Sequence, residues 1–371
     1  MEKPDVSKKG RTIMEKQAVC SCGGRVADGQ APKHRASFVT GSREAGGTAV
    51  PVVSTRLSRA DVIGGWKVRW DIGRMRYTVE PGLYAAGTPG PESPVLVTAN
   101  YKLTFDSVRR ELAGIDGWIL VLDTRGINVW CAAGKGTFGT RELQQRIAAV
   151  RLDQVVSHRT LILPQLGAPG VSAHEVKAAS GFRVKYGPVR AADIPSFLAA
   201  EQKKNADMRR VRFGFSDRMT IAPAEVSHSW PAVLAVVAAS VLLALPFRTG
   251  YLPRLLGFVI PLLGSVLMGT VAFPALLPVL PFRAFSLKGA TLGVLWAVAA
   301  AFIVRATLPS AAALVLIIAP VVAFLSMAFT GSSTFTCQPG AALEVRRGVV
   351  PMIASLVLGV GLAVAARILA I

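Results

Sequence analysis

The residues best suited to chemistry in this chain lie between positions 128 and 140, which read Asn-Val-Trp-Cys-Ala-Ala-Gly-Lys-Gly-Thr-Phe-Gly-Thr. Cys131 precedes Lys135 by four positions, so on a helix the thiol and the ammonium would share one face. There Lys135 would support a thiolate, which is the form of cysteine that binds metals. The small residues at 132–134 would let a flat ligand approach the backbone closely.

Three other interpretations of this stretch compete with a reactive cysteine. A phosphate-binding P-loop is excluded, because Gly134-Lys135 is followed by Gly136 and not by Ser or Thr. A dinucleotide fingerprint fits the spacing of Gly134, Gly136 and Gly139, but these glycines do not directly follow a strand-like run. An ordinary buried cysteine is the remaining alternative, and the residue types alone leave it open.

The other cysteines are Cys20, Cys22 and Cys337, and four this scattered suit neither a disulfide scaffold nor an iron–sulfur cluster. The Cys20/Cys22 pair could chelate a soft metal. Nothing close in the sequence completes such a site.

The elements that must position Cys131 lie in a segment with α/β character, which we place at 51–195. Strand-like apolar runs alternate with helix-like runs there, and this predicts a Rossmann-like domain with a mostly parallel sheet. The expected strands are 95–98, 118–122 and 160–163, and the expected helices are 105–112, 141–150 and 173–180.

Ligands of parallel sheets bind at the carboxyl ends of the strands. Three loops should meet there, at 98–100, 126–135 and 165–170. They offer amides and backbone groups with little charge, which suits a large, mostly apolar ligand with amide edges. Outside the Cys131 stretch, the candidate contacts are Thr98, Asn100, Leu166 and Gly167.

The composition changes near Trp230, and positions 231–343 contain no Asp or Glu. The mean hydropathy of the whole chain is +0.45. Five stretches approach the length that a membrane span requires, and they predict an all-α transmembrane domain over 230–371. We expect an anchor, since transporters usually carry acidic groups within their spans. The stretches are 231–247, 255–273, 289–304, 310–329 and 349–366.

The chain carries 42 basic and 22 acidic residues, a net charge of +20. Several basic residues lie in a juxtamembrane linker at 196–229, which favours a cytoplasmic sheet domain and the inner membrane of the cell. The basicity therefore suits a membrane surface, and without a recognition motif we expect no nucleic-acid partner. Residues 1–50 are expected to form a flexible tail.

Two stretches resemble known corrinoid proteins. The octapeptide at 128–135 is similar to the signature N-(V/I)-W-C-A-A/G-G-K of the HgcA family of mercury-methylating corrinoid proteins. The run at 93–104, Ser-Pro-Val-Leu-Val-Thr-Ala-Asn-Tyr-Lys-Leu-Thr, resembles the corrinoid iron–sulfur protein of the acetyl-CoA pathway. The HgcA family pairs a cytoplasmic corrinoid domain with a C-terminal membrane domain of about five helices, and the resemblance covers roughly residues 50–371.

The resemblance implies cobalamin or a related corrinoid as cofactor, with Cys131 as the lower axial ligand of its cobalt. It also implies that Lys135 supports the thiolate. The D-x-H-x-x-G motif of His-ligated corrinoid proteins is missing from the sequence, which agrees with ligation by cysteine. Neighbouring positions would shape the cap helix under the ring and contact it: Asn128, Val129, Trp130, Ala132, Ala133 and Gly134.

The implied activity is a corrinoid-dependent methyltransferase that transfers a methyl group from cobalt to Hg(II), forming methylmercury. Methyltetrahydrofolate or a corrinoid partner would supply the methyl group, and an HgcB-like ferredoxin with two 4Fe–4S clusters would supply electrons. Cys337, in a loop expected on the cytoplasmic side, is a possible relay for Hg(II) or a residue without a role.

Two other functions stay open. One is a corrinoid methyl carrier of one-carbon metabolism with a non-mercury acceptor. The other is a transporter with a nucleotide-binding domain.

Overall fold

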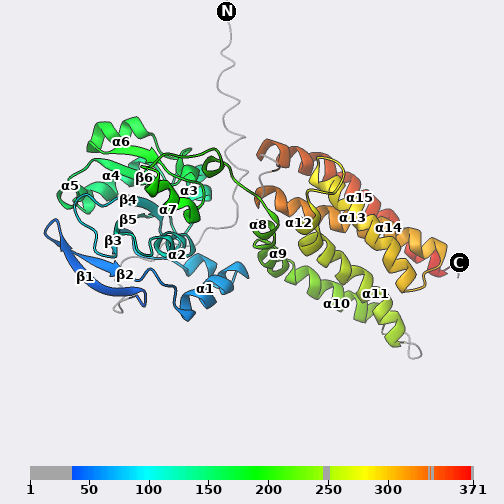
Figure 1. The fold of residues 1–371 in the computed structure, drawn as a ribbon. Coiled ribbons are helices and arrows are strands. Elements are labelled where there is room, and N and C mark those ends of the chain that lie inside the picture. Colours follow the sequence, from blue (N-terminus) through cyan, green and yellow to red (C-terminus); the bar gives the residue numbers. More distant parts are fainter. Residues whose placement is uncertain (1–35, 245–250, 333–334, 336–337, 369–371) are drawn as a thin grey trace, which may run out of the picture.

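The computed structural model describes residues 36–244, 251–332, 335 and 338–368. An α/β sheet domain is followed by a helical C-terminal part, and the two lie side by side (Figure 1). Cys20, Cys22 and Cys337 lie outside the described residues.

The sheet has seven strands in the order β1-β2-β3-β5-β4-β6-β7. It is mixed: β1 pairs antiparallel with β2 and β3 with β5, while the other four pairings are parallel. The prediction of a mostly parallel sheet is therefore correct for its central and C-terminal strands. The bounds are β1 Val39–Ala45, β2 Thr48–Val53, β3 Gly82–Ala86, β4 Val95–Ala99, β5 Gly117–Leu122, β6 Thr160–Leu163 and β7 Arg183–Tyr186.

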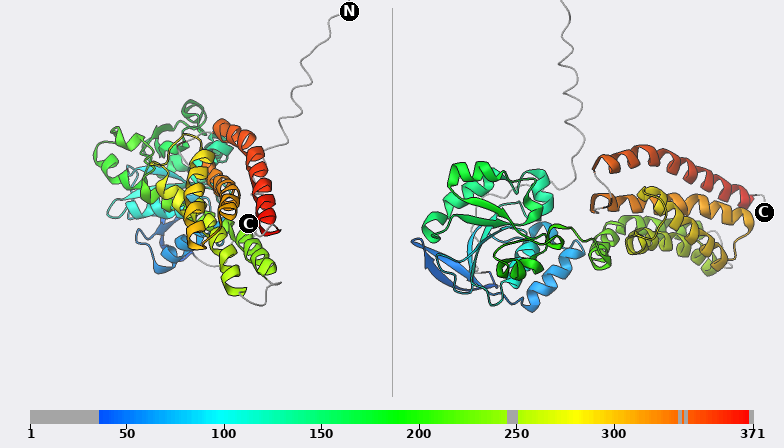
Figure 2. Two further views of the ribbon diagram at one scale, coloured as in Figure 1. Left: turned by 90° about the vertical axis from the view of Figure 1, so that its right-hand side faces the viewer. Right: turned by 45° about the horizontal axis from the view of Figure 1, so that its top comes forward.

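The central strands β4 and β5 are buried along their whole length. Such continuous apolar runs are typical of strands that helices cover on both faces. Helices α3 to α6 cover one face, and α2 and α7 cover the other, with α1 lying against α2 (Figures 1 and 2). Their bounds are α1 Arg59–Arg69, α2 Lys102–Glu111, α3 Val129–Lys135, α4 Thr140–Ala149, α5 Leu152–Val155, α6 Ala173–Ser180 and α7 Ile194–Ala199.

The three predicted strands and three predicted helices are all present, with boundaries that differ by at most three residues. The first two strands, however, begin before residue 50, within the segment expected to be a tail. They form a hairpin whose turn, Gly46-Gly47, has positive φ angles of 56° and 73°. Glycine adopts this conformation without steric cost.

The chain changes direction around β4. Helix α2 carries it from β4 to β5 on one face of the sheet, and α3 to α5 carry it back past β4 to β6 on the other face. The carboxyl ends of the neighbouring strands β4 and β6 therefore border a topological switch point. In open α/β sheets this is where ligands bind.

Among the described residues, the helical part has four helices long and apolar enough to cross a membrane: Leu255–Leu276, Phe285–Ile303, Leu308–Thr330 and Pro339–Ala366. They correspond to four of the five expected spans. The first expected span, 231–247, is described only as far as Ala244. Helix α10 is the described part of this first span. The elements of the helical part are α8 Phe215–Met219, α9 Ala222–His228, α10 Trp230–Ala244, α11 Tyr251–Leu267, η5 Met268–Ala272, α12 Phe273–Leu276, α13 Phe285–Ile303, α14 Leu308–Met327 and α15 Gln338–Ile368.

One detail differs from the prediction. Helix α15 begins eleven residues before position 349, so residues 338–348, which precede the last expected span, are already helical. A break in the helical path follows α12, in a stretch that contains Pro278 and Pro281. Two buried cations satisfy its carbonyl groups: Arg218 donates to Pro274 O and Ala275 O, and Lys288 donates to Leu277 O and Leu280 O.

Candidate functional site

Helix α3 is short and is fixed at both ends by its own sequence. Asn128 is the N-cap, and its side-chain oxygen accepts a hydrogen bond of 3.0 Å from the Cys131 amide. Gly136 ends the helix with a φ of 79°, a left-handed conformation that favours glycine. The Asn-x-x-Cys spacing therefore holds the backbone of Cys131 directly.

The two faces of α3 differ sharply. Val129, Ala132 and Ala133 are buried against the sheet domain. The opposite face exposes Trp130, Cys131, Gly134 and Lys135. The thiol and the ammonium thus share a face, as their spacing predicts, and the free Cys131 is open to a ligand from outside.

The loop after β6 holds α3 in place through two close approaches. A Cβ on Gly170 would lie 2.2 Å from the Phe138 carbonyl oxygen and 3.0 Å from Ala133 Cα. A Cβ on Gly167 would lie 2.5 Å from the ring of Phe138. Only glycine allows the backbone to pass this closely, so these positions set the distance between α3 and the sheet.

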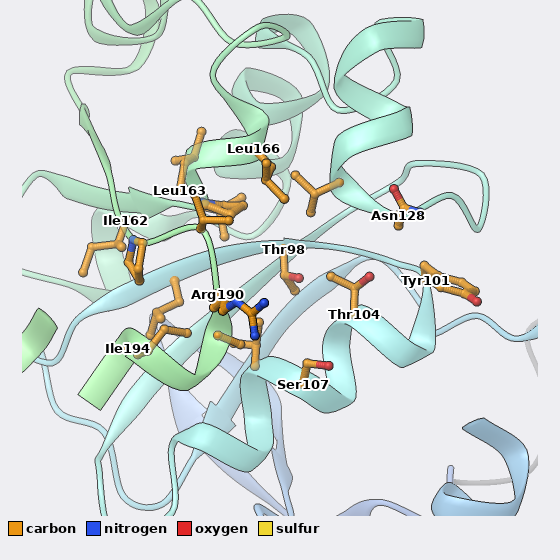
Figure 3. Close-up of a pocket in the computed structure, with 18 of the residues that line it drawn as sticks. Thr98, Tyr101, Thr104, Ser107, Asn128, Ile162, Leu163, Leu166, Arg190 and Ile194 are labelled. Atoms are coloured by element: carbon orange, nitrogen blue, oxygen red, sulfur yellow. The ribbon is translucent and has the colours of Figure 1, made fainter. Parts of the chain in front are cut away.

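A pocket of about 330 Å³ opens at the switch point, between the carboxyl ends of β4 and β6 (Figure 3). Helix α2 forms one wall, and the start of α3, the turn η2 (Gln165–Gly167) and the loop before α7 form the others. The lining is mainly apolar, with Leu96, Ile162 and Ile194 among its residues. A lining of this kind would suit a mostly apolar ligand, and the predicted ligand, large and with amide edges, stays a prediction.

The polar groups of the pocket come from four elements. Thr98 Oγ1 is buried and finds no hydrogen-bond partner among the described residues. Thr104 and Ser107 lie one turn apart on α2, and Arg190 carries the one charged side chain among the described lining residues. Burial raises the pKa of Tyr101, so its phenol remains a hydrogen-bond donor at neutral pH. An unpaired buried hydroxyl such as Thr98 costs free energy that a ligand could recover.

The predicted site residues fall into three groups. Thr98, Asn128, Val129 and Leu166 line the pocket. Trp130, Cys131, Gly134 and Lys135 lie on the outer face of α3, next to it along the chain. The remaining predicted contacts, Ala132, Ala133, Gly167 and Asn100, take no part in the lining, and the first three pack the helix and the loop together.

Asn100 does not point a free amide at a ligand. Its side-chain oxygen accepts hydrogen bonds from Thr124 N, Thr124 Oγ1 and Gly126 N, and its amide group donates to Asp123 Oδ1. The side chain therefore shapes the loop that leads into α3. Its contact with a ligand stays a prediction, and two backbone amides and one hydroxyl already donate to its side-chain oxygen.

Arg190, Thr104, Ser107 and Tyr101 were not among the predicted residues. A signal for Arg190 exists: Arg183–Tyr186 forms β7, and the residues after its carboxyl end must reach the same edge of the sheet as the other loops. The residues on α2 carry no comparable signal, because a Thr or Ser on a helix is most often exposed to solvent.

Groups of metal-binding side chains add no further candidate metal site in the described part of the chain. Within the described residues, no group of three or more His, Cys, Asp or Glu side chains could hold a metal ion. Cys337 lies outside these residues, so its possible part in handling Hg(II) stays a prediction.

Comparisons with known proteins place the similarity on the sheet domain. Residues 73–198 match the family described as CO dehydrogenase/acetyl-CoA synthase delta subunit. The acetyl-CoA decarbonylase/synthase complex subunit gamma of Archaeoglobus fulgidus is 37% identical over 122 residues, which are 32% of this chain and 26% of that protein. The subunit of the same name from Methanopyrus kandleri is 38% identical over 125 residues, 33% of this chain and 27% of that protein.

The chain therefore spans about a quarter of the length of these curated relatives. The matched residues include the pocket and α3, whereas α1 and the helical part lie outside the family match. The names of the relatives refer to acetyl-CoA complexes and say nothing of mercury. The similarity thus supports the second of the two resemblances seen in the sequence, and it leaves the assignment to mercury methylation open.

Proposed function

We propose that this protein is a membrane-anchored, corrinoid-dependent methyl-transfer protein in which Cys131 ligates cobalt. The observation that carries the proposal is the position of a free, exposed thiol on a capped helix beside a pocket at the switch point of the sheet. The match to acetyl-CoA synthase subunits over this region and the signature-like sequence of α3 both support it.

The residues present fit a corrinoid in three respects. A cysteine thiolate is a soft ligand suited to a transition metal. The face around it is open at Gly134, because among the described residues nothing lies within 4 Å of a Cβ placed there. The pocket offers the unpaired hydroxyl of Thr98 and the guanidinium of Arg190, which suit the amide and phosphodiester groups of a corrinoid. At about 330 Å³ the pocket takes only part of so large a ligand.

When bound, the corrinoid supplies a cobalt that carries a methyl group between a donor and an acceptor. The protein tunes this chemistry chiefly through the axial ligand. Cys131 would donate electron density, Asn128 would fix its backbone, and Lys135 on the same face would offset the thiolate charge. Ala132 and Ala133 would hold the helix against the sheet.

Two methyl acceptors follow from different observations. The names of the relatives favour an acceptor of one-carbon metabolism. The sequence of α3 and the four apolar helices favour Hg(II), as in the family that the octapeptide resembles. In the second case the partners would be a two-cluster ferredoxin as electron donor, with methyltetrahydrofolate or a corrinoid protein as methyl donor, and the site would lie at the inner membrane.

The test is a pair of substitutions at Cys131 in the full chain. Cys131→Ala should abolish methyl transfer and change the visible absorption of the bound corrinoid, because the cobalt loses its sulfur ligand. Cys131→His should keep a ligand that donates electrons more weakly, so the corrinoid stays bound while methyl transfer slows. A Cys20→Ser/Cys22→Ser/Cys337→Ser variant, measured with saturating Hg(II), is the control for loss of other thiols.

The outcomes separate the alternatives. A purified chain that binds no corrinoid would overturn the whole proposal. If Cys131→Ala keeps more than about a tenth of the wild-type rate, a barrier change below about 1.4 kcal/mol, ligation by Cys131 is wrong. A loaded wild-type protein that methylates a one-carbon acceptor but not Hg(II), with reductant and ferredoxin present, would assign it to one-carbon metabolism.

A further inference from the structure

Helix α1 presents an apolar face to the outside of the sheet domain. Val62, Ile63 and Trp66 are 59%, 53% and 58% exposed, and Trp70 continues the same stripe one turn later, its ring centroid 5.8 Å from that of Trp66. On a soluble surface, large apolar side chains normally occur singly. We call this stripe, together with the exposed Ile72 and Met75 that follow it, the α1 face.

The direction of the α1 face is fixed by the opposite side of the helix. Asp61 is buried and forms ion pairs with Lys102 at 2.6 Å and with Arg109 at 2.9 Å, both on α2. Gly65 and Val68 complete the buried side, and a Cβ on Gly65 would lie 3.2 Å from Leu103. Helix α1 cannot roll its apolar side chains inward without breaking a buried ion-pair network, so the exposure belongs to the fold.

Basic residues flank the apolar stripe. Arg59, Lys67 and Arg69 lie on α1 and are exposed, and Arg76 follows in η1 (Arg74–Arg76). An apolar stripe with tryptophan, bordered by Lys and Arg, is the pattern of helices that lie in the interfacial layer of a membrane. Tryptophan also concentrates at that level in membrane proteins.

The α1 face lies next to the first apolar helix of the C-terminal part. Ser227 donates a hydrogen bond of 2.9 Å to Trp70 O, and His228 Nε2 lies 3.2 Å from Asp71 Oδ2. Helix α10 begins two residues later at Trp230, which is 59% exposed. Figures 1 and 2 show α1 on the side of the sheet domain that faces the helical part.

We propose that the α1 face docks on the headgroup layer of an anionic lipid leaflet. In this proposal α10 and the four apolar helices that follow it cross the same membrane. The contacts with residues 227–228 hold α1 at the level where α10 enters the bilayer. The positive charge of the basic flanks complements the negative charge of anionic headgroups. Only one side of α1 is apolar, as in a helix that lies in the membrane interface, whereas a membrane span is apolar all round. The match to acetyl-CoA synthase subunits begins at residue 73, after α1, so the shared fold does not account for this surface.

Docking at α1 would also orient the candidate site. Helices α1 and α3 belong to opposite faces of the sheet, but both lie at the edge of the sheet domain that faces the helical part (Figure 1). The loop before α3 lies close to the segment that follows α1, since a Cβ on Gly126 would lie 2.8 Å from Thr78 Cγ2 and 3.6 Å from Met75 O. The exposed face with Cys131 would then be held close to the membrane surface.

The experiment uses the full chain in lipid nanodiscs and the fluorescence of Trp66 and Trp70. Subtracting the emission of a Trp66→Phe/Trp70→Phe variant from that of wild type isolates these two residues. The discs contain phosphatidylcholine with or without phosphatidylglycerol, and a fraction of the lipid carries bromine on the acyl chain, either near the headgroup or near the methyl end.

The expected result is stronger quenching by bromine near the headgroup than by bromine near the methyl end, and stronger quenching in discs with phosphatidylglycerol. High salt should weaken it. A Lys67→Glu/Arg69→Glu variant should lower the ratio of docked to undocked protein by roughly fivefold or more per residue. The matched control is Lys177→Glu/Arg183→Glu, which makes the same charge change on the exposed surface of α6 and β7.

Two results would overturn the proposal. In the first, neither brominated lipid quenches the isolated emission in anionic discs, but acrylamide in the water quenches it; the α1 face is then exposed to water. If neither lipid nor acrylamide quenches it, a protein covers the face, either a second copy or another partner. The readout does not depend on a corrinoid, so its failure is distinct from failure of the proposed function.

Discussion

Substituting Gly170 by Ala tests whether the distance between α3 and the sheet controls the site. The new Cβ would lie 2.2 Å from the Phe138 carbonyl oxygen and 3.0 Å from Ala133 Cα, against about 3.4 Å for ordinary contact. The two backbone segments must therefore separate by about 1 Å. The φ angle of Gly170 is not in the left-handed region, so steric overlap is the main cost.

A shift of this size has two measurable consequences. Overpacking should lower the free energy of unfolding by about 1–3 kcal/mol. A displacement of about 1 Å at a reacting group commonly costs about 100-fold in rate, so methyl transfer should fall by that order while much of the corrinoid still binds. Thermal unfolding, corrinoid absorption and single-turnover methyl transfer measure the three quantities separately.

The matched control is Gly82→Ala on β3, where the new Cβ has nothing within 4 Å among the described residues. It should melt and react like wild type. A Gly170→Ala protein with the wild-type rate and unfolding temperature would refute the argument that this loop sets the position of Cys131. Loss of stability with an unchanged rate would assign Gly170 to folding alone.

Two further substitutions test the scaffold. Asp61→Asn should cost about 3–5 kcal/mol at neutral pH, because it leaves buried Lys102 and Arg109 with one carboxylate fewer. Burial raises the pKa of Asp61, but its hydrogen bonds, led by that from Lys102, lower it well below the ordinary 3.8. Asp61 therefore stabilises the fold above that pH, and thermal melts should show the gap to Asp61→Asn narrowing as the pH falls through 3.8 and below; a constant gap would contradict this. In the helical part, Gly293→Leu should lower the melting temperature in detergent, because even a Cβ there would lie 2.8 Å from Ala319 Cα on α14. Gly361→Ala is the control and should leave the melting temperature unchanged, because a Cβ there would meet open space among the described residues.

The sequence predicts the central sheet well, because burial on both faces leaves a strong signal. Strands β4 and β5 are continuous apolar runs, and β6 matches its prediction residue for residue. The expected tail covers β1 and the first residues of β2, because β1 mixes polar and apolar residues and predicts no strand. Its Gly46-Gly47 turn was the available signal, since two glycines between strand-like runs favour a tight hairpin turn.

The candidate site is only partly readable from sequence, for a physical reason. Thr98 ends one predicted strand and Leu166 follows another, so the topology alone brings them to one edge. Whether a polar side chain there stays available depends on partners that sequence spacing does not reveal. The side-chain oxygen of Asn100 accepts hydrogen bonds from Thr124 N and Gly126 N, which lie more than twenty positions away in the sequence. Arg190 lines the pocket while pairing with Asp217 on α8, a contact that no motif indicates.

The two halves of the candidate site meet at the start of α3, where Asn128 and Val129 both line the pocket, and Asn128 makes the closer link. Its side chain caps α3 and lines the pocket, so it joins the helix that carries Cys131 to the cavity that contains Thr98. A ligand small enough for the cavity alone would have no reason to reach the outer face of α3. A ligand broad enough to touch both must extend beyond the cavity, with one side open to a donor or acceptor. Under the proposed function, a large cofactor that exchanges a group with a second molecule would meet both conditions and would need Cys131 to be exposed, as it is.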